Sequence, residues 1–344
     1  MKKTLTALAF VVLVTLATFA QAIPTLDTFK GAFQGFSASM AGSLALNSSV
    51  GSTWSDAYIG GFPHFGAGLA VGTAFAGSGA LKTVFDAVGI GMPTALSGIG
   101  LPFPIVAATA KIGLPFIPVD IGVKVGYLPP ELGASIKGLT GVSTDYINLG
   151  GQLRFALLQE NLLFPALSIG LGANYQKGSI SAPLPIPGGS KSFSQDLGPG
   201  GSWKMKISDP DLGLGWESTT YDATVQVSKR LLVITPYVGL GYTLGTNSVK
   251  GGLTNAMSVS YTPVGGSEQV KTVADLRNAF AAANVAAPNL DAFGFSFGAN
   301  ANDPVLRVYG GLALNIIVLI LDIQATYVPV TSNLGATVTA RLQI

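Results

Sequence analysis

The C-terminal segment, residues 305–344, constrains the fold most, because every second residue is apolar in three successive runs. These apolar positions are Leu306, Val308, Leu312 and Leu314, then Leu321, Ile323, Ala325 and Tyr327, then Leu334, Ala336, Val338, Ala340, Leu342 and Ile344. Side chains of a β-strand alternate between two faces, so each run predicts a strand with one apolar face and one polar or small face. A half-buried strand of a soluble sandwich has the same period, so the alternation alone leaves both classes open.

The last of these runs carries a family resemblance. Val338, Ala340, Leu342 and Ile344 form an apolar face that ends on the final residue, with no polar tail after it. This resembles the closing strand of bacterial outer-membrane β-barrel proteins, which acts as an assembly signal and ends on an aromatic residue, where this chain has Ile344. The resemblance implies a transmembrane barrel in the bacterial outer membrane, with outer-membrane lipid and the barrel-assembly machinery as partners.

The composition favours the barrel over the sandwich. Only 10% of the residues are charged while 48% are hydrophobic, whereas a soluble protein has about 25% charged residues. After the N-terminus, the longest apolar run, residues 316–321, is far shorter than the roughly 20 residues that a membrane helix needs. A transmembrane barrel combines both properties, because its apolar residues are spread over many short alternating strands.

The N-terminus predicts export. Lys2 and Lys3 precede an apolar core at residues 5–19 and a small-x-small cleavage site at residues 20–22, so residues 1–22 are expected to be a cleaved signal peptide. A retained membrane anchor is the less favoured alternative, since it needs about 20 apolar residues. Without Lys2 and Lys3, the 19 basic residues become 17 against 17 acidic ones. A neutral mature chain argues against a nucleic-acid partner.

The rest of the chain divides into a short N-terminal segment and a barrel. Residues 23–35 are expected to form a helix of apolar residues spaced by three or four, placed either on the periplasmic side or in the lumen as a partial plug. Residues 36–344 are expected to form an all-β, antiparallel, up-and-down barrel that begins with a weak hairpin, residues 36–46 and 54–62. The pattern predicts about twelve strands, or about fourteen if residues 257–261 and 293–297 form an extra hairpin. Long loops are expected at the outer end and tight turns at the inner end.

Charged residues on the polar face of the strands predict the lining of the lumen. Each would be costly against lipid, so the side on which it falls tests the register. These residues could line a water path or select solutes by charge, or they could pair with one another and fill the lumen. The lumen-lining candidates are Asp120, Lys124, Arg154, Arg307, Asp322 and Arg341.

Aromatic residues near the outer ends of the predicted strands suggest a membrane boundary. Rings with polar tips favour the interface, so a shared height predicts an outer aromatic girdle, while strand propensity alone explains only their presence. The predicted girdle consists of Phe75, Tyr127, Tyr175, Tyr221, Tyr242 and Tyr327.

Signals for catalysis are nearly absent. The only histidine, His64, falls in a turn on the predicted periplasmic side, and a general base also needs an activated nucleophile within hydrogen-bond reach. We therefore expect no enzymatic activity, no cofactor and no metal site. The cysteine-free chain also excludes a lipid-anchored lipoprotein and disulfide bonds.

Two functions remain. The first is a passive outer-membrane channel or transporter for small solutes, a hydrophobic solute being one class, in a manner similar to fatty-acid transport barrels although no motif of that family is matched. The second is a non-transporting surface scaffold whose long loops, residues 176–218 and 245–304, bind a partner. An open, hydrated lumen would favour the channel, and a closed, salt-bridged lumen with mobile loops would favour the scaffold.

Overall fold

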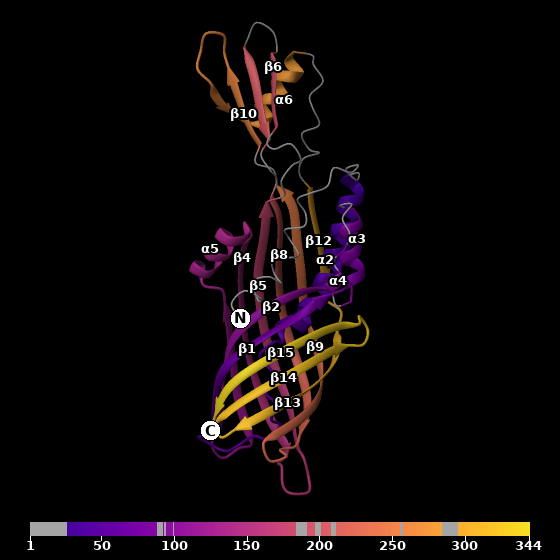
Figure 1. The fold of residues 1–344 in the computed structure, drawn as a ribbon, viewed down its shortest axis with the longest axis vertical. Coiled ribbons are helices and arrows are strands. Elements are labelled where there is room, and N and C mark those ends of the chain that lie inside the picture. Colours follow the sequence, from indigo (N-terminus) through magenta and orange to yellow (C-terminus); the bar gives the residue numbers. More distant parts are fainter. Residues whose placement is uncertain are drawn as a thin grey trace.

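The chain folds into an antiparallel β-barrel with helices and a small second sheet at one end (Figure 1). The computed structural model describes residues 26–87, 92, 94–98, 100–183, 191–196, 201–207, 211–254, 257–283 and 295–344. The predicted signal peptide, residues 1–22, lies outside this range. No helix among the described residues is long and apolar enough to cross a membrane.

Ten strands close the barrel. Each pairs antiparallel with the next, and the last strand returns to pair with the first, from Gly66 opposite Gln343 to Ala74 opposite Gly335. The barrel strands are β1 (Phe65–Ala76), β2 (Leu101–Gly113), β3 (Val119–Tyr127), β4 (Ser143–Leu158), β5 (Ala166–Pro183), β8 (Asp211–Ser228), β9 (Ile234–Thr254), β13 (Val305–Ile316), β14 (Leu319–Val328) and β15 (Asn333–Gln343).

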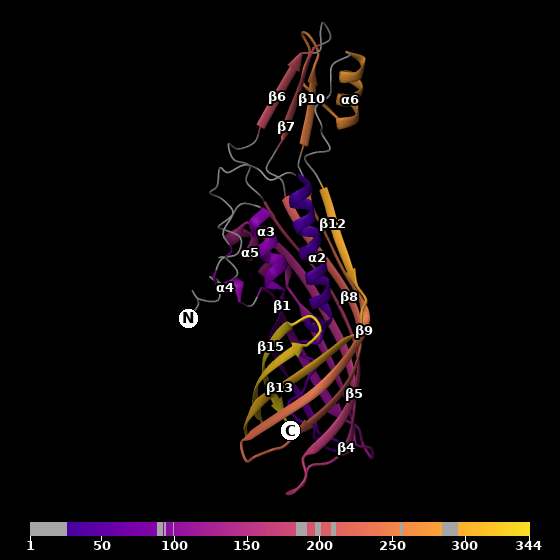
Figure 2. The ribbon, with the colours of Figure 1, turned by 90° about the vertical axis from the view of Figure 1, so that its right-hand side faces the viewer.

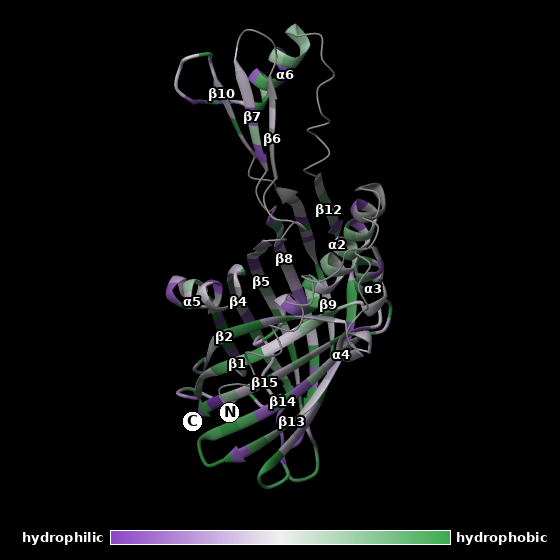
Figure 3. Cartoon of the chain, turned by 45° about the horizontal axis from the view of Figure 1, so that its top comes forward, coloured by the Kyte–Doolittle hydropathy of each residue, from purple (hydrophilic) through white to green (hydrophobic). Residues whose placement is uncertain are grey.

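The alternation in the sequence becomes the inside and outside of this barrel. Along β14, Leu321 and Ile323 are exposed on the outer surface while Asp322 is buried in the lumen. Hydrophobic (green) and hydrophilic (purple) stretches accordingly follow one another along the strands of the lower barrel (Figure 3). The predicted all-β, antiparallel barrel is therefore confirmed.

The two ends of the barrel differ. The β2–β3, β4–β5, β8–β9 and β13–β14 turns lie at one end, here named the tight-turn end, and the long insertions lie at the other, the long-loop end (Figure 1). This separation agrees with the predicted distribution of tight turns and long loops. The helices outside the wall strands are α3 (Ser78–Ala87), α4 (Thr94–Ser97), α5 (Pro130–Thr140) and α6 (Val273–Ala282).

A small unit stands beyond the long-loop end (Figure 2). Its sheet has the order β11-β10-β7-β6, and α6 packs on one face of it through Leu276 and Phe280, which contact Met205 and Val259. Thr272 caps α6 with a capping box to Asp275, and the hydrogen bonds from Thr272 lower the pKa of Asp275. The strands are β6 (Lys191–Asp196), β7 (Ser202–Ile207), β10 (Met257–Thr262) and β11 (Gln269–Lys271).

The predicted extra hairpin is divided between two places. Residues 257–262 form β10 of the small unit, whereas β12 (Phe295–Ala301) pairs with the far half of β9, beyond the region where β9 pairs with β13. Residues 293 and 294 lie outside the described residues. The hairpin partners are separated because β10 finds its hydrogen-bond partner in β7.

The expected count of about twelve strands is not what the structure shows, because the predicted first hairpin does not form. Residues 36–46 belong instead to helix α2 (Leu26–Ser48), and residues 54–62 form no strand. The helical spacing seen at Phe29 and Phe33 continues through Phe36, Met40 and Leu44, which all become buried. The barrel wall thus begins at Phe65 rather than at residue 36.

Candidate functional site

Helix α2 occupies the interior of the barrel near the long-loop end (Figure 2). Its second half is rich in serine, alanine and glycine, and small side chains allow a helix to fit a narrow lumen. Ser43 donates hydrogen bonds to the carbonyls of Ser39 and Phe75, and Asn47 accepts one from the Ala74 N–H. At the other end of the helix, the Gln34 side chain pairs with both backbone groups of Gly298 on β12.

After α2, the chain continues through the lumen to the tight-turn end and becomes β1 there. We call residues 26–64 the plug. Ser48 bonds Thr220 at 2.9 Å, Ser52 bonds Asn174 at 3.0 Å, and the Ala57 N–H donates to Ser228 at 2.8 Å. Together with Gln159 at the start of the β4–β5 turn, which donates to the Ile59 carbonyl at 2.7 Å, these contacts bind the plug to this turn, β5 and β8.

The C-terminal end of α2 is held by a lysine of the wall. Helix ends leave backbone carbonyls without intrahelical partners, and a cation there also complements the helix dipole. Lys124 of β3 supplies both the hydrogen-bond donor and the positive charge. Its ammonium donates to the carbonyls of Ser48 and Val50, the latter at 2.8 Å. A residue predicted from its strand position alone is therefore a direct contact of the plug.

The plug carries one aromatic anchor, Trp54, which is only 2% exposed. The Lys111 ammonium and the Arg341 guanidinium lie 4.5 and 4.3 Å from the indole ring centroid. Cations near an indole face are attracted by its quadrupole, more strongly when desolvated. The indole therefore binds the plug to two wall strands, β2 and β15.

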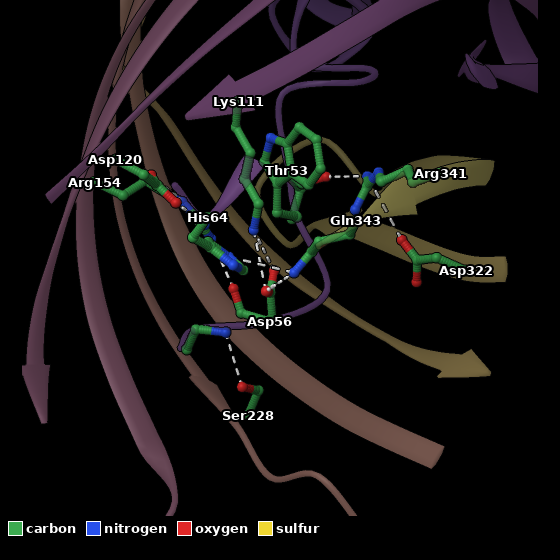
Figure 4. Close-up of polar contacts among 12 residues, drawn as sticks. Thr53, Asp56, His64, Lys111, Asp120, Arg154, Ser228, Asp322, Arg341 and Gln343 are labelled. Atoms are coloured by element: carbon green, nitrogen blue, oxygen red, sulfur yellow. Dashed lines mark hydrogen bonds and ion pairs between the residues drawn. The ribbon is translucent and has the colours of Figure 1, made fainter. Parts of the chain in front are cut away.

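Asp56 forms the polar centre of the plug (Figure 4). Both carboxylate oxygens lie 3.0 Å from the Lys111 ammonium, Gln343 donates to one of them at 2.7 Å, and Arg154 donates to the Asp56 carbonyl at 2.7 Å. The Lys111 side chain is fully buried. A buried ammonium without a counter-charge is very costly, so Asp56 keeps this part of the lumen electrically balanced.

The six predicted lumen residues all lie buried inside the barrel. Arg154 pairs with Asp120 through two hydrogen bonds, and Arg341 lies 3.8 Å from Asp322. Arg307 instead pairs with Asp222 at 2.7 Å. The predicted residues thus form pairs across strands and, through Lys124, Arg154 and Arg341, also reach the plug.

Four residues of this network were missed in the sequence: Trp54, Asp56, Lys111 and Asp222. Lys111 and Asp222 could have been found, because both fall on the polar face of their strands. Trp54 and Asp56 offered no such signal, since their segment has no strand period. Only the folded chain shows that they lie opposite Lys111.

The lumen around the plug is nearly filled. Two cavities between plug and wall each measure about 10 Å³, one lined by Ser52, Arg154, Asn174 and Arg307 and the other by Val50 and residues of β1, β14 and β15. A volume of this size accommodates about one water molecule. Neither cavity has room for a solute larger than water.

His64 lies where the plug meets β1, at the tight-turn end. Its ring is 3.4 Å from the Gln343 amide and makes an edge contact with Tyr58. Burial, followed by the charge of Lys111, lowers the pKa of His64 from its usual 6.5, so the ring is neutral at pH 7. The described residues contain no group of three side chains that could hold a metal ion.

The predicted girdle residues face outward. Tyr127, Tyr221, Tyr242 and Tyr327 are exposed, while Phe75 and Tyr175 are half-buried. The predicted assembly signal also faces outward: Val338, Ala340, Leu342 and Ile344 lie on the exposed side of β15 and its end. Ile344 pairs with Phe65 through both backbone groups, so the final residue closes the seam of the barrel. The roles of these residues in the membrane and in assembly remain predictions.

Comparisons with known proteins give structural likenesses only. No protein-family model and no curated protein matches the chain. Among solved structures, it is similar to the translocator domain of autotransporter NalP from Neisseria meningitidis, with 12% identity, 83% of this chain and 90% of that chain covered, and a TM-score of 0.28. It is also similar to the toluene transporter TbuX of Ralstonia pickettii, with 10% identity, 86% and 92% covered, and a TM-score of 0.26.

A further similar structure is the Pseudomonas putida toluene transporter TodX, at 10% identity, with 87% of this chain and 96% of that chain covered and a TM-score of 0.24. The fold assignment itself rests on the strand pairing. The closed antiparallel barrel with an apolar outer face is the fold that the predicted resemblance to bacterial outer-membrane β-barrel proteins implies.

Proposed function

We propose that the protein is a bacterial outer-membrane channel or transporter in which the plug closes the lumen and must shift for a small solute to pass. A filled lumen by itself is what we expected of a scaffold, so the observation that carries the channel proposal is how the polar lumen is filled: by a segment of the same chain that is held through reversible contacts. Within the described residues, the plug joins the wall covalently only at Phe65. All its other contacts are hydrogen bonds, ion pairs and packing, which can break and re-form.

The apolar lining near the long-loop end supports a solute with a hydrophobic part. Phe36, Met40 and Leu44 of α2 pack there with Leu81 and Phe85 of α3, and Phe103 and Trp216 flank this cluster. A small apolar solute could replace part of this packing, while the charged network lies nearer the tight-turn end. In a chain with Trp54 and Trp203 replaced by phenylalanine, Trp216 fluorescence would report binding of such a solute.

A reversible cross-link tests whether the plug must move. The chain has no cysteine, and the side-chain oxygens of Ser48 and Thr220 lie 2.9 Å apart between plug and wall. We expect S48C/T220C, refolded into liposomes, to lose swelling in neutral sugars and amino acids when oxidised, and to regain it on reduction. D145C/S179C is the matched control, because this hydrogen-bonded pair joins β4 to β5 and leaves the plug free.

The outcomes separate the hypotheses. Equal swelling of oxidised and reduced S48C/T220C would show that solutes pass without movement of the plug. Absence of swelling in every form, including the wild type, would exclude passage of these polar solutes and leave hydrophobic transport and partner binding; lack of a Trp216 response to apolar solutes would then favour the scaffold. Empty liposomes set the baseline in each case.

The second candidate function, a surface scaffold, is supported by the small unit. Its sheet and α6 enclose their own core of Met205, Val259, Leu276 and Phe280, so this insertion is a folded module rather than an irregular loop. A module beyond the long-loop end is well placed to bind a partner outside the cell. Removal of residues 257–283 with unchanged swelling would separate such binding from transport.

The remaining expectations belong to the same proposal. The apolar outer wall would contact outer-membrane lipid, β15 would engage the barrel-assembly machinery, and the predicted signal peptide would direct export. Transport of this kind involves no covalent chemistry, cofactor or nucleic acid. Fractionation of the cell envelope, followed by heat-dependent gel mobility of the barrel, would test the location.

A further inference from the structure

The turns at the tight-turn end carry exposed apolar side chains at their tips. Turns normally favour glycine, asparagine, aspartate or serine. Such small or polar residues would also be expected if these turns were exposed to water in the periplasm. Here the four tips are hydrophobic, and the ends of the lower turns are correspondingly coloured as hydrophobic (Figure 3). The tip residues are Phe116 (103% exposed), Leu162 (95%), Leu163 (81%), Leu232 (94%) and Ile317 (97%). We call this set the apolar rim.

Three rim residues adopt a backbone conformation that disfavours them. The φ angles of Phe116, Leu232 and Ile317 are 69°, 56° and 56°. In this left-handed region a residue with a Cβ is strained by roughly 1–2 kcal/mol, and glycine or asparagine would relieve the strain. Local turn chemistry therefore does not explain the apolar side chains at these positions.

Polar backbone groups of the β4–β5 turn, which carries Leu162 and Leu163, and of Arg230 in the β8–β9 turn have partners within the protein. Lys229 donates to the carbonyls of Asn161, Leu162 and Phe164, the latter two at 3.3 and 3.2 Å. The Asn161 side chain accepts from the N–H groups of Leu163 and Phe164, and Glu160 accepts from the Arg230 N–H at 3.1 Å. Internal pairing of this kind is what a backbone needs near hydrocarbon, where water is scarce.

The distance from the girdle to the rim matches the hydrocarbon layer. Tyr327 follows Ile317 by ten positions, and Tyr242 follows Leu232 by ten as well. At about 3.3 Å per residue and a tilt of about 40°, this span covers about 25 Å along the barrel axis. The apolar band of outer-membrane barrels is also about 25 Å tall.

We propose that the apolar rim lies in the bilayer, at the inner boundary of its hydrocarbon layer, and that phospholipid acyl chains cover the turn tips. This inference rests on the proposed membrane location and adds where the inner boundary falls. The rim is continuous with the apolar outer wall. Because that wall would face lipid, lipid would cover the rim as well. The exposed Arg230 beside Leu232 is compatible with this depth, because an arginine side chain extends its charge toward the headgroups.

Single cysteines in the cysteine-free chain test the proposal. L232C and I317C would each carry the environment-sensitive fluorophore NBD, in protein refolded into phosphatidylcholine vesicles. Quenching would be measured with lipids spin-labelled on the acyl chain and with aqueous iodide. I323C, on the outer face of β14, serves as the lipid-facing reference, and V270C, 89% exposed in the small unit, as the water-facing one.

We expect both rim probes to be quenched by the labelled lipid as I323C is, and to be shielded from iodide. Quenching of both rim probes by iodide as strongly as V270C, with I323C still quenched by lipid, would overturn the rim proposal and leave the membrane location intact. Such water-exposed tips would then suit a protein partner in the periplasm. Iodide quenching of I323C itself would mean that the barrel does not enter the bilayer, so both proposals would fail.

Discussion

The guanidinium of Arg341, on the closing strand β15, lies 4.3 Å from the centroid of the Trp54 indole in the plug. Arg341 also donates to the Thr53 carbonyl at 2.5 Å, whereas its Nε and Nη1 atoms have no hydrogen-bond partner among the described residues. A buried guanidinium with few hydrogen bonds depends on its remaining contacts. We therefore expect closure of the barrel at β15 to be coupled to the presence of the plug.

Replacement of Trp54 by alanine tests this coupling. The change removes a buried indole and its contacts with two cations, so we expect the plug to loosen by about 3 kcal/mol. Liposome swelling should increase, and the midpoint of urea unfolding should fall. Trp54→Phe keeps a ring over the cations and should show a smaller effect; an alanine variant with wild-type swelling and stability would contradict the anchor role.

Asp56→Asn should destabilise the protein more than removal of the carboxylate from an exposed ion pair. It leaves the buried Lys111 ammonium without a counter-charge, which costs of order 3 kcal/mol. The control is Asp86→Asn, whose partner Lys82 is exposed and one helical turn away, so at most about 0.5 kcal/mol is expected. Urea unfolding followed by intrinsic fluorescence measures both, and equal effects would argue against the buried pair.

Adjacent residues of β3 test the faces of the barrel. Val123 is exposed on the outer wall, so Val123→Arg places a charge against lipid at a cost of about 2–4 kcal/mol near the bilayer midplane. We expect impaired barrel assembly, seen as loss of heat-dependent gel mobility. Lys124→Ala should assemble but swell more readily, because the plug loses its contacts at Ser48 and Val50. Equal assembly of both variants would contradict the assigned faces.

Two glycines distinguish the seam from an open position on the wall. A Cβ on Gly68 would lie 2.2 Å from the Ala340 carbonyl oxygen on β15, whereas one on Gly151 would meet nothing within 4 Å. Gly68→Ala should therefore hinder pairing of β1 with β15 and lower the yield of heat-resistant barrel. Gly151→Ala should match or exceed the wild type, and a reversed order would show that the seam pairs differently.

The single histidine predicts one component of the pH dependence. Burial and the charge of Lys111 lower the pKa of His64 below 6.5. The imidazole is therefore harder to protonate in the folded protein than in the unfolded chain. Stability should be unaffected by His64 above about pH 7 and should decrease as the pH falls below about 6.5. Unfolding free energies between about pH 5.5 and 7.5 in the wild type and His64→Gln would show this slope only in the wild type.

Much of the barrel could be predicted because strand faces are a local property. The alternation along residues 305–344 correctly gave three strands and placed Arg307, Asp322 and Arg341 inside. The same parity placed Asp120, Lys124 and Arg154 on the lumen side, where the structure has them buried. Neighbours two residues apart decide such a pattern, so no knowledge of distant partners was needed.

The strand number and the path of the plug were decided only in the tertiary structure. Residues 54–62 have weak periodicity, and the helical spacing of residues 36–46 does not say what the helix packs against. The place of both segments depends on partners such as Lys111, Lys124 and Arg341, which are distant in sequence. The ten wall strands pair among themselves. Several of their inward-facing charged side chains then bind the plug, which is the segment that does not join the wall. The sequence by itself thus determined which face of each strand is apolar. Tertiary contacts determined what fills the space that those strands enclose, because only closure of the barrel brings the buried charges and their partners together.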